Sequence, residues 1–226
     1  MKLIKIADCL IGLDDSTYEG FSGLQEYSVE TMNRPEFVLP RWSENTGIEI
    51  KAFVYQLLCK EILKKEIIPF HGSAITINGH AHIFIGPSGA GKSTHAKMWK
   101  KAFPDSTEII NDDRPFLRFG KDIVVYGSPW MGKHQIGRNI QAELKSICLI
   151  KQGKINCINR ITETKAIPLL LRQCFPYNDL HAVDTVLKMV RRLAETVPIW
   201  ELTCLKDKSA AEIAYCAMEG DYGINE

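Results

Sequence analysis

The chain has 226 residues, with 28 Lys and Arg against 27 Asp and Glu, which gives a formal net charge of +1. This balance excludes a strong bulk attraction to nucleic acids or to anionic membranes. No apolar run approaches the roughly 18–20 residues that span a bilayer, and the N-terminus lacks the long apolar region of a secretory signal. We therefore expect a cytoplasmic, soluble protein with no nucleic-acid and no membrane partner.

The chain contains seven cysteines, an odd number, and no Cys-x-x-Cys pair. Several of them lie in apolar strand or helix patterns. We expect reduced thiols that serve as small apolar side chains, and we do not expect a structural zinc site.

Residues 1–47 carry few signals beyond Leu3–Ala7, which has the composition of a strand. From Ile48 to Lys65 apolar residues recur at helical spacing and predict an amphipathic helix that packs on a sheet. Two strand-like runs follow, Ile67–Ile77 and His82–Ile85, separated by Asn78-Gly79, a strong hairpin signal. The second of these strands therefore has an antiparallel neighbour, which favours a mixed sheet.

The stretch Gly86–Thr94 fits the pattern Gly-x-x-x-x-Gly-Lys-Ser/Thr. It lies between the apolar strand and a helical pattern over Thr94–Phe103, which is the context that a phosphate-binding loop requires. Glycines let successive backbone N–H groups approach an anion, and a helix N-terminus adds the positive end of its dipole.

In such a loop Lys92 would reach the β- and γ-phosphates, and the Ser93 hydroxyl would bind Mg²⁺. The sequence therefore predicts a site for a nucleoside triphosphate, ATP, together with Mg²⁺. The residues predicted to bind the nucleotide are Gly86, Ser88, Gly89, Ala90, Gly91, Lys92, Ser93 and Thr94.

The next apolar strand, Glu108–Asn111, ends in two adjacent carboxylates, Asp112 and Asp113. A metal–triphosphate site needs an acidic residue at the end of a neighbouring strand, and phosphoryl transfer needs a carboxylate that accepts a hydroxyl proton. Side chains of adjacent strand residues point to opposite faces, but at a strand end the chain can turn and direct both into one site. Asp112 and Asp113 could supply both functions.

The rest of the chain predicts further strands, two helices between them and a closing helix. The segment Gly127–Arg138 holds three glycines with Lys133, His134 and Arg138, as in a lid or acceptor-binding loop, although a plain connection explains it equally well. The predicted elements are strands at Pro115–Phe119, Ile123–Tyr126, Leu144–Ile150, Lys154–Ile161 and Pro198–Cys204, and helices at Thr162–Cys174, Asp179–Thr196 and Asp207–Glu219. Hairpins are predicted around 120–122 and around Gln152-Gly153.

We predict an α/β fold with a phosphate-loop-containing mixed sheet and flanking helices. Residues 1–47 would form an N-terminal segment that packs on the core, and residues 48–226 a catalytic domain.

With these motifs placed, the chain resembles the catalytic domain of HPr kinase/phosphorylase, whose nucleotide-binding core is shared with phosphoenolpyruvate carboxykinases. The resemblance covers roughly Phe70 to Gly137 and rests on the order and spacing of His71-Gly72, the Gly86–Thr94 loop and Asn111–Arg114. The chain is also similar to stand-alone HPr-kinase-like proteins of bacterial peptide-modification systems, some of which phosphorylate a serine of a precursor peptide.

The resemblance implies a role for each matching residue. Lys92 would bind the phosphates and Ser93 the Mg²⁺, while Asp112 and Asp113 would divide proton abstraction and metal binding. Between the two we favour Asp112 as the base and Asp113 as the metal ligand. His71 would lie close to the reacting phosphate, and Arg138 would match an arginine of a mobile loop.

These observations favour an ATP- and Mg²⁺-dependent kinase that phosphorylates a serine hydroxyl of a small protein or peptide. HPr itself and the reverse phosphorylase reaction are not expected, because only 70 residues precede His71 and the loop after Tyr126 differs from that of the bifunctional enzymes. A kinase for a small molecule, such as free serine or a sugar alcohol, and a non-catalytic nucleotide-sensing module remain the alternatives. The sequence leaves the oligomeric state open, a homo-oligomer included.

Overall fold

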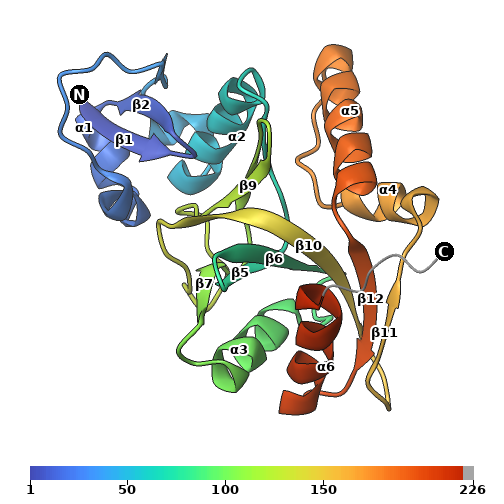
Figure 1. The fold of residues 1–226 in the computed structure, drawn as a ribbon. Helices are drawn as coiled ribbons and strands as arrows, with labels where there is room; N and C mark the ends of the chain where they lie inside the picture. The colour runs from blue at the N-terminus through green and yellow to red at the C-terminus, as the bar shows by residue number, and fades with distance from the viewer. Residues whose placement is uncertain (221–226) are drawn as a thin grey trace.

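A computed structural model describes residues 1–220 of the chain (Figure 1). The strands are β1 (Lys2–Ile6), β2 (Cys9–Leu13), β3 (Phe37–Val38), β4 (Ile67–Pro69), β5 (Ser73–Ile77), β6 (His80–Ile85), β7 (Thr107–Asn111), β8 (Phe116–Phe119), β9 (Ile123–Tyr126), β10 (Gln141–Gln152), β11 (Cys157–Arg160) and β12 (Ile199–Cys204). The helices are α1 (Asp15–Glu19), α2 (Ile50–Leu63), α3 (Lys92–Ala102), α4 (Glu163–Leu171), α5 (Leu180–Thr196) and α6 (Lys208–Glu219), with 3-10 turns at Ser22–Tyr27 and Glu44–Thr46. Within residues 1–220 no helix is long and apolar enough to cross a bilayer.

The main sheet is mixed and curled. Its order is β4-β8-β9-β10-β6-β5-β7, and β12 extends it beside the C-terminal half of β10, with β11 outside β12. Strands β6, β10 and β12 run parallel, whereas β5 pairs antiparallel with both β6 and β7. The Asn78-Gly79 hairpin between β5 and β6 is therefore confirmed, with Asn78 and Gly79 both at positive φ, as a tight two-residue turn requires.

The central strands are buried on both faces, which is why their sequences are continuous apolar runs. Along β6, Ile83 and Ile85 pack on one side of the sheet, while Phe84 packs on the other. Helices α4 and α5 cover the first side, and α3 and α6 cover the second (Figure 1). Each buried aliphatic or aromatic side chain contributes about 1.5–3 kcal/mol, so these two layers fix the central strands firmly.

The N-terminal residues form a small sheet, β1-β2-β3, beside α2 (Figure 1). This sheet shares one hydrophobic cluster with α2 and with Phe116, Tyr126 and Trp130 of the larger sheet and its loop. Residues 1–47 thus contact the rest of the molecule through a common core. The boundary at residue 47 stays a prediction.

One predicted pairing is wrong. We expected β10 and β11 to form a hairpin around Gln152-Gly153, but β12 lies between them and pairs parallel with β10 and antiparallel with β11. The reason is burial: β12 carries the apolar residues Ile199 and Leu202 into the sheet, whereas β11 is largely exposed and suits the edge.

The predicted run Ile67–Ile77 is divided into two strands, since β4 pairs with β8 whereas β5 pairs with β6 and β7. The other predicted elements are confirmed within a few residues, including the β8–β9 hairpin. Strand β2 was not predicted. Four of the seven cysteines are buried, as small apolar side chains should be, while Cys157 and Cys216 are exposed.

Candidate functional site

Three segments converge at one edge of the main sheet. Because β6 and β7 are both antiparallel to β5, their C-terminal ends reach the same edge, where β5 begins. The glycine-rich loop leaves β6 there, Asp112 follows β7, and Ser73 opens β5. Residues distant in the sequence are therefore brought together at the start of α3.

The loop between β6 and α3 uses glycine where backbone geometry requires it. Gly89 and Gly91 have φ values of 79° and 105°, in the region that favours glycine. A side chain at Gly86 would meet Ile150 O at 3.0 Å, so only glycine fits beside β10 without a shift. Helix α3 begins with no side-chain cap, and the first N–H groups of a helix have no partners within it. The loop therefore presents open backbone donors.

Lys92 folds back over this loop. Its Nζ donates to Gly86 O at 3.0 Å and to Pro87 O at 3.4 Å. Burial lowers the pKa of the Lys92 ammonium, and the nearby Asp113 carboxylate opposes that shift. The ammonium is thus held by neutral carbonyls, which an anion could replace. Ser88 and Thr94, two further residues predicted to bind nucleotide, are exposed.

Ser93 joins the loop to the strand end that carries the aspartates. The hydroxyl of Ser93 donates to Asp112 O at 3.2 Å, and the hydroxyl of Ser73 donates to the same carbonyl at 2.9 Å. The two hydroxyl oxygens lie 3.2 Å apart. Ser73 was not singled out from the sequence, and its place directly after His71-Gly72 is the only signal that could have found it.

Asp112 directs its carboxylate away from Ser93 and toward the 127–138 loop. Its Oδ1 accepts from Gly132 N at 2.6 Å, while its Oδ2 is buried without a partner among the described residues. Burial raises the pKa of this carboxyl, although hydrogen bonds from the backbone of Gly132 and Ile136 oppose the shift. An unpaired buried carboxylate oxygen is costly, and the cost points to a ligand atom or cation at this position.

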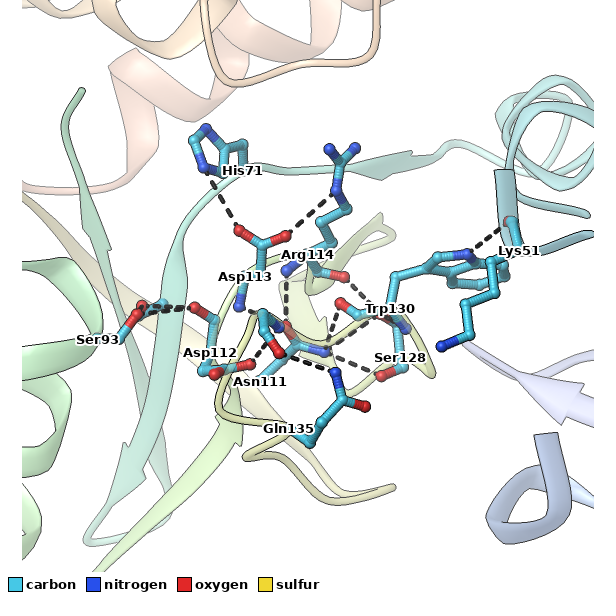
Figure 2. A network of polar contacts seen from close by, with 12 residues as sticks. Lys51, His71, Ser93, Asn111, Asp112, Asp113, Arg114, Ser128, Trp130 and Gln135 are labelled. Carbon is cyan, nitrogen blue, oxygen red and sulfur yellow. Dashed lines mark hydrogen bonds and ion pairs between the residues drawn. The ribbon is translucent and has the colours of Figure 1, made fainter. Parts of the chain in front are cut away.

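Asp113 lies between two basic side chains (Figure 2). His71 Nε2 is 3.5 Å from its Oδ1, and Arg114 Nε is 3.3 Å from its Oδ2. Burial lowers the pKa of His71, and the Lys92 ammonium lowers it further. Lys92, Asp113 and His71 therefore lie close enough, next to the glycine-rich loop, for their charges to influence one another.

Asn111 holds the Asp-Asp turn in place, as Figure 2 shows at its centre. Its Oδ1 accepts from Asp113 N at 2.8 Å and from Arg114 N at 2.6 Å. Its Nδ2 donates to Ser128 O at 2.9 Å. This buried amide fixes both the turn and the loop that supplies Gly132, a role that the sequence pattern did not reveal.

Arg138 lies outside this group. Its guanidinium pairs with Glu108 Oε2 at 2.9 Å, near the beginning of β7, and its side chain is 64% exposed. In this structure the arginine is therefore not brought to the aspartates at the end of β7, and its catalytic role stays a prediction.

The residues at the loop fit a magnesium ion that is bound mainly through phosphate. No cluster of three or more His, Cys, Asp or Glu side chains that could hold a metal occurs within residues 1–220. Mg²⁺, however, is usually held by one or two carboxylates together with water and substrate phosphates. The Ser93 hydroxyl and the Asp113 carboxylate are oxygen donors of that kind.

Comparison with solved structures finds a distant likeness to the HPr(Ser) kinase/phosphatase from Coxiella burnetii, with a TM-score of 0.31 and 13% sequence identity. The match covers 56% of this chain and 97% of that chain. No protein-family model and no curated protein sequence matches. The likeness is a distant one, at the level of the fold.

Proposed function

We propose that the protein is an ATP- and Mg²⁺-dependent kinase that transfers the γ-phosphoryl group to a serine hydroxyl of a peptide or small protein. The observation that supports this most is the hydrogen bond from Ser93 to Asp112 O, because it joins a glycine-rich loop to a pair of carboxylates. A site that only bound nucleotide would not need two carboxylates beside the loop.

In this proposal the open N–H groups of the loop and Lys92 bind the triphosphate. Lys92 exchanges its bonds to Gly86 O and Pro87 O for phosphate oxygens, which bind an ammonium more strongly. Mg²⁺, bound by Ser93 and Asp113 together with the phosphates, would supply charge neutralisation for the transferred group.

Asp112 is the proposed base. Its raised pKa makes it a stronger proton acceptor than an exposed aspartate, and Oδ2 has no other partner in residues 1–220. The serine O–H proton passes to the Asp112 carboxylate while the serine oxygen bonds to the γ-phosphorus. The bond from that phosphorus to the β–γ bridging oxygen breaks, and ADP leaves with the bonding electrons.

The test measures ADP release and phosphate incorporation by mass spectrometry, with Mg²⁺-ATP and serine-containing peptides from the host organism. Asp112→Asn keeps the oxygen that accepts from Gly132 N but loses basicity, so we expect transfer to fall by roughly 10²–10⁴. Lys92→Ala should abolish both ADP release and phosphate incorporation. Asp122 is exposed in the β8–β9 turn, so Asp122→Asn is a matched control. It should change neither ADP release nor phosphate incorporation.

Near-normal transfer by both Asp112→Asn and Asp113→Asn would exclude this chemistry. ADP release driven by free serine or a sugar alcohol, without peptide phosphorylation, would assign the protein to the small-molecule kinases. Tight nucleotide binding with no transfer to any acceptor would assign it to the nucleotide-sensing modules.

A further inference from the structure

A groove of about 860 Å³ lies between α2 and the chain that runs from Phe175 into the first turns of α5. This volume is within the range of about 300–1,000 Å³ that is typical of ligand sites. The residues that line it are Gln56, Lys60, Leu63, Lys64, Phe175, Pro176, Tyr177, Asn178, Asp179, His181, Ala182 and Thr185. None of them belongs to the site described above.

The apolar wall of the groove is already fixed. Phe175 and Tyr177 pack edge to face with their ring centroids 4.9 Å apart, and Phe175 also packs on Tyr55 at 5.7 Å. The Tyr177 hydroxyl donates to Cys59 O at 3.0 Å, which anchors the segment to α2. The aromatic surface is therefore ordered before a ligand binds, so binding does not carry the entropy cost of ordering these side chains.

The charged side chains that line the groove are Lys60, Lys64 and Asp179, so positive charge is in excess. Lys64 is paired with Glu61 at 2.7 Å, and the Asp179 carboxylate is used as the cap of α5, where it accepts from His181 N at 3.1 Å. Lys60 has no acidic partner within residues 1–220. An acidic group on a ligand would complement this ammonium.

A chain of side-chain contacts connects the wall of the groove to Asp113. Tyr55, which packs on Phe175, also lies under the Arg114 guanidinium at 4.9 Å from ring centroid to Cζ. Arg114 in turn contacts Asp113 at 3.3 Å. On the other side, the backbone N–H of His71 donates to Gln173 O at 2.8 Å, two residues before Phe175.

We propose that this groove holds the segment of the acceptor peptide that flanks its serine, and that this segment carries an apolar and an acidic side chain. The proposal rests on the proposed kinase function and adds the class of acceptor. The apolar side chain packs on Phe175 and Tyr177, the carboxylate pairs with Lys60, and the serine reaches the Asp112–Asp113 edge. A small-molecule acceptor would leave the groove without a role.

The first experiment measures binding alone, so that it does not depend on catalysis. The probes are two short fluorescein-labelled peptides with one serine and one leucine, one carrying two glutamates and the other two lysines. Binding to the Lys92→Ala protein is followed by fluorescence polarisation. We expect the glutamate peptide to bind more tightly, and Lys60→Glu to weaken it by roughly fivefold to tenfold while strengthening the lysine peptide.

Two further variants sharpen the test. Lys154 is an exposed lysine in the β10–β11 connection, without an acidic partner in the described residues, and Lys154→Glu makes the same charge change outside the groove. It should leave the affinity for both peptides unchanged. Ala182→Phe fills the groove with apolar bulk at constant charge, and it should weaken both peptides.

The outcomes separate this inference from the proposed function. If peptide phosphorylation did not depend on Lys60→Glu or on peptide charge, the groove would not be the peptide-binding site. The proposed kinase function would be unaffected by that result. Charge-dependent binding that Ala182→Phe abolishes would support the groove even if no phosphate were transferred. Equal, weak binding of both peptides to every variant would overturn it.

Discussion

At the scale of single residues, Asn111 is the side chain on which the arrangement of the candidate site depends most. It supplies the acceptor for two backbone N–H groups of the Asp-Asp turn and the donor for Ser128 O. We expect Asn111→Ala to lower the free energy of unfolding by about 1–3 kcal/mol for each buried group left without a partner. It should also lower phosphoryl transfer, because the turn no longer holds Asp113. Urea unfolding and the peptide assay measure the two effects.

Asn111→Asp keeps the acceptor oxygen but loses the amide donor and adds a third negative charge beside two carboxylates. It should therefore retain the turn better than alanine does while still weakening the contact to Ser128. Asn45→Ala, at an exposed site, serves as the control. If Asn111→Ala unfolded at the wild-type urea concentration, the amide would not hold the turn as described.

The residues of the glycine-rich loop could be placed from the sequence because strand, loop and helix are adjacent in the chain. The position of Lys92 and Ser93 at the start of α3 follows from that order alone. The orientation of Asp112 could not be predicted, since its carbonyl faces Ser93 while its carboxylate faces Gly132. That choice depends on a loop twenty residues away, and no local pattern encodes it.

At the scale of secondary-structure elements, the C-terminal end of α6 is fastened to β6 and β10 by a buried polar group. Glu219 Oε1 lies 2.8 Å from His82 Nε2 and 3.4 Å from Lys145 Nζ, and His82 Nδ1 lies 2.8 Å from Ser146 Oγ. Burial lowers the pKa of His82, so the ring is neutral near pH 7, donates to Glu219 and accepts from Ser146. Burial alone would raise the pKa of Glu219, but His82 and Lys145 outweigh it and lower the pKa to about 2.

The direction of the pH effect follows from these shifts. A carboxyl whose pKa is lower in the folded chain stabilises the fold above its unfolded pKa of about 4.3, and that contribution is lost as the pH falls toward 2. A histidine buried in its neutral form acts in the same direction below about pH 6.5. We expect Glu219→Gln to lower the free energy of unfolding by about 1–3 kcal/mol at pH 7 and to flatten its decline below pH 4.5.

Urea unfolding at several pH values between 7 and 3 measures this effect. Glu212→Gln, on the exposed face of the same helix, should change stability by less than about 1 kcal/mol. A Glu219→Gln protein with the stability and pH slope of the wild type would show that the pair contributes nothing.

Most elements could be predicted because their signals are local, such as the helical spacing in α2 and the Asn-Gly turn before β6. Strand order is a different matter. The Gln152-Gly153 turn is compatible with a hairpin, and the insertion of β12 between β10 and β11 is decided by which strand buries more apolar surface. Such competition between distant segments is invisible in a window of a few residues.

At the scale of the whole molecule, the small N-terminal sheet and the main sheet are joined through one apolar cluster. Phe21 packs on Trp130 at 5.6 Å, and Trp130 stacks on Phe116 of β8 at 5.8 Å. At the rim of the same contact, the Tyr126 hydroxyl donates to Asp8 at 2.5 Å, and Asn139 N donates to Glu26 at 2.7 Å. The last of these bonds links the N-terminal residues to the chain that follows the 127–138 loop.

Because the two sheets share this core, we expect them to unfold together, and a defect on one side should weaken both. Phe21→Ala opens a cavity beside Trp130 and should cost about 3–5 kcal/mol. In hydrogen exchange pulses at increasing urea, peptides from β2 and from β6 should then become labelled at the same, lowered urea concentration. Met32→Ala, at a fully exposed position of the N-terminal segment, should not change the urea concentration at which either peptide becomes labelled. Earlier labelling of β2 with β6 unchanged would mean that the small sheet is an independent unit, and that its contact with Trp130 adds nothing to the stability of the candidate site.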